Sequence, residues 1–272
     1  MPDIAVNGAT IHYESTGAGR ETIVFAHGLL WSGEMYAAQV AALSKRYRCV
    51  TFDFRGQGRS QVTPSGYDMD TLTADAAALI EALGVAPVHF VGLSMGGFVG
   101  IRLAARRPEL VRSLVLLETS SQPEPRESAP RYRLLGFLGR WIGFVFVDRF
   151  VMPIMFGKTF MHDPARAEER EHWRKRLVAN DRLGIYRALG GVVGRAGVEH
   201  ELANIRCPTL VVVGDEDVAT VPARAERIRE GIAGARLVVI PQAGHSSTIE
   251  EPAAVNDAIE SFLTEYKGIL DQ

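Results

Sequence analysis

A serine between two glycines, in Gly92-Leu93-Ser94-Met95-Gly96, has the residue types and spacing of a catalytic nucleophile. An apolar, β-rich run precedes it and an apolar helical pattern follows. A serine on a sharp strand-to-helix turn has strained backbone geometry, and the neighbouring glycines give it room. Its hydroxyl then projects above the unpaired N–H groups of the helix. The pattern predicts a nucleophile elbow, although a serine N-cap without chemistry has the same local sequence.

A serine hydroxyl is a weak nucleophile at neutral pH and needs a base to take its proton. Among the seven histidines, His245 lies on a loop directly after a late apolar run, 237–240. The other histidines fall in strand patterns, in the helical region after residue 118 or, for His27, before the serine. We therefore predict His245 as the general base. His27 is predicted to be structural, holding its own loop by hydrogen bonds.

The base needs a carboxylate to orient it, and Asp215, Glu216 and Asp217 all follow the apolar run 210–213. The orienting group must lie past the turn and point back toward the imidazole. Asp217 meets this requirement, because it stands three residues beyond Gly214 and just before the next helical pattern. Asp215 and Glu216 are closer to the strand end, where solvated or turn-forming carboxylates are typical. The prediction is Asp217, with Asp215 as the alternative.

Acyl transfer also needs donors for the developing oxyanion. The backbone N–H of Met95 follows the nucleophile, and that of Leu29 lies in the loop after the apolar run 22–26. Gly28 allows this loop to turn closely. Leu29 and Met95 are the predicted oxyanion donors.

The elements that must position these groups alternate between strand and helix patterns. Short Val/Ile/Leu runs bounded by Gly, Pro or Asp are typical of strands buried on both faces of a parallel sheet. Runs of this kind are 22–26, 47–52, 88–92, 114–117, 209–213 and 237–240, whereas 4–6 and 10–13 alternate like a hairpin pair. Helical patterns lie between them, at 70–83, 95–107, 222–231 and 252–266. The expected fold is α/β, with a mostly parallel, doubly wound sheet of about eight strands.

Between residues 118 and 208 this alternation stops and the pattern is mostly helical. We predict a core domain of residues 1–119 and 207–272, with a helical cap, or lid, inserted over 120–206. Large apolar residues are dense in 131–160 and charges in 163–176, as a lid over an apolar pocket requires. Candidate substrate-binding residues are Trp31, Phe137, Trp141 and Phe144. The alternative is that the lid aromatics only hold the lid to the core.

Five motifs together make the chain resemble the α/β-hydrolases over nearly its whole length. They are His27-Gly28-Leu29-Leu30, Asp53-Phe54-Arg55-Gly56-Gln57-Gly58-Arg59-Ser60, Gly92-Leu93-Ser94-Met95-Gly96-Gly97, Gly214-Asp215-Glu216-Asp217 and Ala243-Gly244-His245. The elbow, the chain length and the modest lid are similar to 3-oxoadipate enol-lactonases and to cofactor-free haloperoxidase and esterase relatives. The resemblance implies the same triad and oxyanion donors, in the chain order Ser, Asp, His. Asp53 and Arg55 are interpreted as a structural ion pair or a loop brace.

The predicted function is hydrolysis of carboxylic esters or lactones through an acyl-enzyme, with no metal or organic cofactor. The same triad would serve a carbon–carbon bond hydrolase or a perhydrolase, and a slow-turnover ligand sensor can also keep it. A serine at the elbow disfavours dehalogenase and epoxide-hydrolase chemistry, which needs a carboxylate nucleophile. A lactone that bears a carboxylate would need a cation facing it, and Arg131, Arg133 and Arg140 lie in the lid.

Amino-acid composition and charge restrict the classes of binding partner to be expected. With 30 basic and 32 acidic residues and a net charge of −2, nothing suggests a nucleic-acid partner, so a small-molecule substrate is expected. The N-terminus lacks the basic start and apolar core of a signal peptide. The most apolar tract, 134–147, is interrupted by Arg140 and is too short to span a bilayer. We expect a cytoplasmic monomer or homodimer, in which Cys49 and Cys207 are buried, inert thiols.

Overall fold

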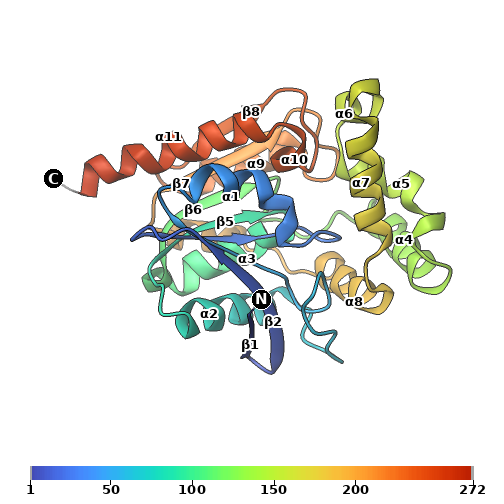
Figure 1. The fold of residues 1–272 in the computed structure, drawn as a ribbon, viewed down its shortest axis with the longest axis horizontal. Helices are drawn as coiled ribbons and strands as arrows, with labels where there is room; N and C mark the ends of the chain where they lie inside the picture. The colour runs from blue at the N-terminus through green and yellow to red at the C-terminus, as the bar shows by residue number, and fades with distance from the viewer. Residues whose placement is uncertain (1, 271–272) are drawn as a thin grey trace.

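The computed structural model describes residues 2–270, and within them the strands form one eight-stranded sheet (Figure 1). The strands are β1 (Asp3–Val6), β2 (Ala9–Thr16), β3 (Thr22–Ala26), β4 (Arg48–Phe52), β5 (Val88–Leu93), β6 (Val111–Leu117), β7 (Thr209–Gly214) and β8 (Arg236–Ile240). Their order in the sheet is β1-β2-β4-β3-β5-β6-β7-β8. The β1–β2 and β2–β4 pairs are antiparallel and the other pairs are parallel. The predicted mostly parallel α/β sheet is therefore confirmed.

Helices cover both faces of the sheet. On one face lie α1 (Ala37–Leu43) and α11 (Pro252–Leu270), and on the other lie α2 (Met69–Ala82), α3 (Met95–Arg106) and α9 (Pro222–Gly231). Successive strand residues point to opposite faces, so Phe25 of β3 belongs to the same buried cluster as Leu43 of α1. Its neighbour Val24 belongs to the opposite cluster, with Leu79 of α2 and Ile101 of α3. Two apolar layers thus hold the sheet rigid beneath the site.

A run of helices separates β6 from β7, where the strand–helix alternation was expected to stop. These helices are α4 (Ala129–Trp141), α5 (Asp148–Met155), α6 (Lys158–His162), α7 (Ala167–Val178) and α8 (Arg182–Val193). Figure 1 shows them grouped at one end of the molecule, beside the sheet rather than within its two helical layers. The segment 120–206 is called the cap below.

The carboxyl ends of parallel strands meet at one edge of a sheet, and ligands of open α/β sheets bind there. Strand β3 pairs with β5, and β7 pairs with β8. The loop after β3 therefore lies beside the turn that carries Ser94, and the loops after β7 and β8 lie beside one another. This topology gathers the four predicted groups of the site at one edge.

The two cysteines, Cys49 and Cys207, are free thiols. Burial raises the pKa of Cys49 to about 12 and that of Cys207 to about 11, which suppresses the reactive thiolate. Cys49 is buried as predicted and Cys207 is half-buried, and the raised pKa values favour the inert thiol form of both. Across residues 2–270, no helix has the length and apolar character needed to cross a bilayer.

Candidate active site

Ser94 stands between β5 and α3 with φ 51° and ψ −109°. A non-glycine residue with positive φ is strained, and it persists because its surroundings hold it. The Ser94 N–H donates to the Leu117 carbonyl at 2.9 Å, and the Thr119 hydroxyl donates to the Ser94 carbonyl at 2.8 Å. Among the described residues, the Ser94 side chain makes no capping hydrogen bond to α3. The simple N-cap interpretation is therefore wrong, and the hydroxyl is left for another role.

The glycines of the elbow are required by close backbone contacts. A Cβ added at Gly92 would lie 2.3 Å from the carbonyl oxygen of Gly96, and one added at Gly96 would lie 2.0 Å from that of Ala26. Real Cβ atoms do not approach oxygen so closely. The Gly-x-Ser-x-Gly spacing is thus a steric condition for this turn, as its sequence suggested.

His245 and Asp217 form a buried pair. Nδ1 of His245 lies 2.9 Å from Oδ2 of Asp217. Because a carboxylate only accepts, Nδ1 carries the proton and Nε2 remains free to act as a base. Oδ2 also accepts the Thr220 hydroxyl at 2.7 Å, while Oδ1 accepts the N–H groups of Ala219 and Thr220 at 2.8 and 3.0 Å. Burial raises the pKa of Asp217, but His245 and the Thr220 donors outweigh it and leave this pKa below its usual value.

The neighbouring carboxylates have other partners. Oδ1 of Asp215 accepts the Gln242 N–H at 2.7 Å, which braces the turn. Glu216 accepts the N–H and the hydroxyl of Thr159 at 2.8 and 2.7 Å, so it ties this loop to α6. Asp217 is thus the carboxylate that contacts His245, and Asp215, the alternative, is turn-forming.

The loop after β3 is held by His27. Its Nδ1 lies 2.7 Å from the Gly28 carbonyl, which can only accept, and its Nε2 accepts the Phe54 N–H at 2.9 Å. The ring is therefore neutral, and burial lowers its pKa. A Cβ at Gly28 would lie 2.9 Å from Cδ2 of Leu93, so glycine lets this loop pack against the elbow. The structural role predicted for His27 matches these contacts.

Asp53 and Arg55 both brace loops, but not as a pair with one another. Asp53 accepts the N–H groups of Gly33 and Arg59, each at 2.8 Å. Arg55 instead forms a buried ion pair with Asp75, with Nε 2.7 Å from Oδ2. The loop-brace interpretation is therefore correct, and the ion pair between the two residues is wrong. Asp75 was missed because α2 brings it to Arg55 from 20 residues away.

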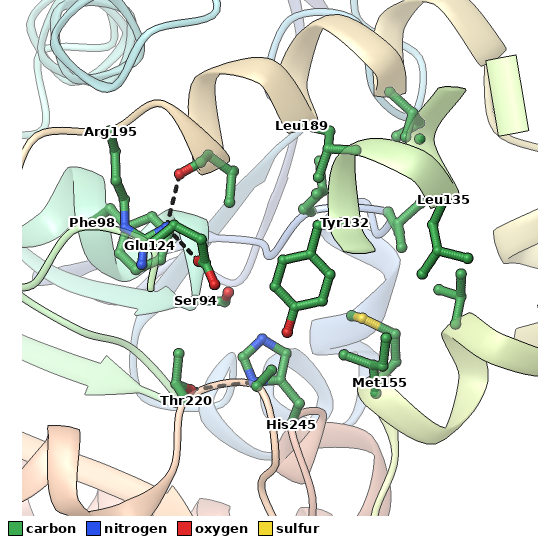
Figure 2. Close-up of a pocket in the computed structure, with 18 of the residues that line it drawn as sticks. Ser94, Phe98, Glu124, Tyr132, Leu135, Met155, Leu189, Arg195, Thr220 and His245 are labelled. Carbon is green, nitrogen blue, oxygen red and sulfur yellow. Dashed lines mark hydrogen bonds and ion pairs between the residues drawn. The ribbon is translucent and has the colours of Figure 1, made fainter. Parts of the chain in front are cut away.

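A cavity of about 110 Å³ opens between the sheet edge and the cap. Ser94, His245 and Leu29 line it from the sheet edge. Its cap side is mostly apolar, and Figure 2 shows Leu135, Met155 and Leu189 there, together with Tyr132. Such a cavity suits a small ligand with an apolar body.

Of the four predicted substrate-binding aromatics, Phe144 lines this cavity. Phe137 and Trp141 are 51% and 63% exposed and lie outside the cavity lining. They share one face of α4, whereas Tyr132, Leu135 and Gly136 lie on its cavity face at i, i+3 and i+4. The prediction is corrected for these two residues, because α4 is apolar on both faces and periodicity alone did not separate them.

The substrate-binding prediction for Trp31 is also corrected. It is buried outside the cavity lining, its Nε1 donates to the Ser246 hydroxyl at 3.2 Å, and it packs edge-on against Phe156 and Trp173. This contact anchors the loop of His245 and the cap rather than a substrate. The arginines considered for a substrate carboxylate, Arg131, Arg133 and Arg140, are likewise absent from the described lining.

Sequence reasoning missed two charged residues of the cavity, Arg195 and Glu124. They stand near the two ends of the cap, 71 residues apart, and carry no local motif. Tertiary contact alone brings them together, so no signal within either segment could have identified them.

Residues 21–252 match the family model described as "alpha/beta hydrolase fold". Together with the sheet order and the elbow, this match shows that the chain belongs to the α/β-hydrolase family and is an enzyme of that class.

Three relatives indicate the range within the family. The crystal structure of the enol-lactonase from Burkholderia xenovorans LB400 superposes with a TM-score of 0.90 at 32% identity, covering 97% of this chain and 100% of that one. "Putative non-heme bromoperoxidase BpoC" of Mycobacterium tuberculosis is 30% identical, over 94% of this chain and 98% of that protein. "Putative carbamate hydrolase RutD" of Rhizobium rhizogenes is 29% identical, over 93% and 97%. The resemblance to enol-lactonase and haloperoxidase relatives is confirmed.

Proposed function

We propose that this enzyme hydrolyses carboxylic esters or lactones through an acyl-enzyme. The observation that carries the proposal is the buried His245–Asp217 pair at 2.9 Å, lining the same cavity as the strained, uncapped Ser94. A paired imidazole beside a projecting hydroxyl is the arrangement that nucleophilic acyl transfer uses.

In the proposed reaction, Nε2 of His245 takes the proton of Ser94 while Oγ attacks the substrate carbonyl. The backbone N–H groups of Leu29 and Met95 stabilise the resulting oxyanion. Met95 is suited to this because it is the first residue of α3, whose first N–H groups have no intrahelical partner. The imidazolium then protonates the leaving alcohol, and the acyl group remains on Ser94.

In the second half, His245 takes a proton from water, which attacks the acyl carbonyl. The imidazolium then returns this proton to Oγ of Ser94 as the acyl–Oγ bond breaks and the acid is released. Asp217 holds the imidazole orientation and stabilises its charged form in both halves. The mechanism uses only side chains, backbone N–H groups and water. The cap of residues 120–206 is proposed as the lid that shapes the pocket, and its apolar lining favours small or medium acyl groups.

The test is a panel of p-nitrophenyl esters of rising acyl length, with simple lactones, assayed on wild type and Ser94→Ala. Wild type is expected to turn over short acyl esters, and Ser94→Ala to lose nearly all activity. Activity retained in Ser94→Ala would refute the mechanism. A carbon–carbon hydrolase or perhydrolase would retain the Ser94 dependence but prefer dienoates or hydrogen peroxide, and a sensor would form product only stoichiometrically.

A further inference from the structure

The cavity contains a charged pair for which the proposed reaction has no use. Nη1 of Arg195 lies 2.9 Å from Oε2 of Glu124, and the two side chains are only 2% and 7% exposed. Both line the same cavity as Ser94 and His245, and Figure 2 shows them on the opposite side of Ser94 from Tyr132. Besides His245 and the Tyr132 phenol, they are the ionisable side chains of the lining, whose remaining polar side chains are those of Ser94 and Thr220.

The rest of the cap holds this pair in place. Nε of Arg195 donates to the Gln122 carbonyl at 3.1 Å, and Nη1 also donates to the Val192 carbonyl at 2.7 Å. The guanidinium stacks over the Phe98 ring, 4.1 Å from its centroid. Arg195 therefore has a fixed orientation before any ligand arrives.

One donor of Arg195 is unused. Nη2 is buried and has no hydrogen-bond partner in the described part of the chain. A buried N–H without an acceptor is unfavourable, and a ligand oxygen in the cavity would relieve this. Nη2 itself has almost no accessible surface, and the side chain that carries it lines the same cavity as Ser94.

The charge of the pair decides which oxygen suits this donor. Burial lowers the pKa of Arg195 and the Glu124 carboxylate opposes that shift, so the guanidinium stays charged and its charge is already compensated. A substrate carboxylate would lose its hydration and meet the negative charge of Glu124 in an apolar cavity. A neutral carbonyl or ether oxygen accepts the Nη2 hydrogen without either penalty.

We infer that Arg195 and Glu124 form a neutral polar subsite that selects uncharged esters carrying a second acceptor oxygen, and that discriminates against substrates with a free carboxylate. The inference rests on the proposed ester hydrolysis and deepens it, since it names the substrate class. The inferred substrate preference differs from that of an enzyme that acts on lactones bearing a carboxylate.

The test uses three methyl esters of matched length: methyl pentanoate, methyl 4-oxopentanoate and monomethyl succinate. Alkyl esters avoid the spontaneous cyclisation that activated succinate esters undergo, and acid release is followed by pH-stat. Wild type is expected to show a kcat/KM for the oxo ester at least tenfold above that for either of the other two. Comparable values for all three esters would overturn the inference.

Two variants assign the effect to the pair. Glu124→Gln keeps the size of the side chain but removes the opposing charge. The kcat/KM for monomethyl succinate, divided by that for the oxo ester, is therefore expected to rise at least tenfold. Arg195→Met combined with Glu124→Gln removes the donor and both charges, and the preference for the oxo ester over pentanoate is expected to disappear. Ratios measured within one variant do not depend on its folded fraction.

The matched control is Glu201→Gln, which loses an ion pair with Arg106 outside the cavity. Its ratios are expected to equal those of wild type. If Glu124→Gln only lowers the melting temperature and leaves the ratios unchanged, the pair is a clamp for the ends of the cap and the inference is wrong.

Binding to Ser94→Ala, measured by ligand-detected NMR with the same esters, separates this inference from the proposed function. If wild type hydrolyses none of the esters but Ser94→Ala binds the oxo ester at least tenfold more tightly than the other two, the function fails and the subsite stands. If Ser94→Ala binds all three equally or binds none, the subsite is refuted.

Discussion

Glu250 gives a stability prediction that can be worked out from the structure. Its buried carboxylate accepts the N–H groups of Gly157, Gly244 and Ser246 at 2.7, 3.0 and 3.0 Å, so it joins the cap to the loop of His245. Burial raises its pKa from 4.5 to about 7, and the charge of Asp217 adds to this, although the three N–H donors oppose it.

The direction of the pH dependence of stability follows from proton binding to Glu250. Between pH 4.5 and about 7 the folded protein holds a proton on Glu250 that the unfolded chain has lost. The free energy of unfolding therefore falls as pH rises through this window. Below and above the window, Glu250 does not make it vary with pH. At about 1.4 kcal/mol per pKa unit, the full effect is roughly 3 kcal/mol, of which roughly 2.5 kcal/mol falls between pH 5 and 8.

The assay compares urea unfolding of wild type and Glu250→Gln at pH 5, 6, 7 and 8. The amide that replaces the carboxyl group cannot titrate and has one acceptor fewer, so the substitution itself destabilises the variant by an amount that does not vary with pH. The wild-type advantage is expected to shrink by roughly 2.5 kcal/mol from pH 5 to pH 8. Titrating groups that do not interact with Glu250 act on both proteins and cancel in the difference. Glu118 is not one of them, because the charge of Glu250 adds to burial in raising its pKa.

Glu168→Gln is the matched control, because Glu168 is exposed on α7. Its difference from wild type is expected to stay flat across the same pH range. A Glu250→Gln difference that is equally flat, or that widens toward pH 8, would refute the reasoning about burial and charge.

Three further predictions concern the site. Asp217→Asn is expected to lower kcat on a short ester by about 10⁴-fold, because the imidazole loses its orienting carboxylate, whereas Asp215→Asn stays within a few-fold of wild type. The reverse order would show that the acid is misassigned. Gly96→Ala forces a methyl group against a main-chain oxygen of β3, and a circular dichroism melt is expected to show unfolding well below the wild-type temperature. Trp141→Ser is expected to leave kcat/KM near wild type while Phe144→Ala changes it several-fold, and equal effects of the two would contradict the assigned lining.

The fold could be predicted because its signals are local. Runs of β-branched and aliphatic residues must be buried on both faces, and every residue of β3, β5 and β7 is indeed buried. The elbow could be predicted for a similar reason, since Gly92 meets Gly96 within the turn itself. The contact that requires Gly96 is with Ala26 of β3 and is distant in sequence.

The pocket could not be predicted in the same way. Helix α4 is apolar on two faces, and its packing on α8 decides that Tyr132 faces the cavity while Trp141 faces solvent. Trp31 looked like a pocket residue because it follows the oxyanion loop, but its ring packs inward against Trp173.

The sequence by itself was enough to predict the class of chemistry, because the proposed nucleophile, its glycines and the order of Ser94, Asp217 and His245 depend on the sterics of one turn and on strand order. Only the tertiary structure decided which side chains line the cavity. Arg195 and Glu124 come from opposite ends of the cap, and neither has a meaning until the fold buries them together. A charge pair of this kind depends on distance in space and on exclusion of water, and the order of residues along the chain records neither.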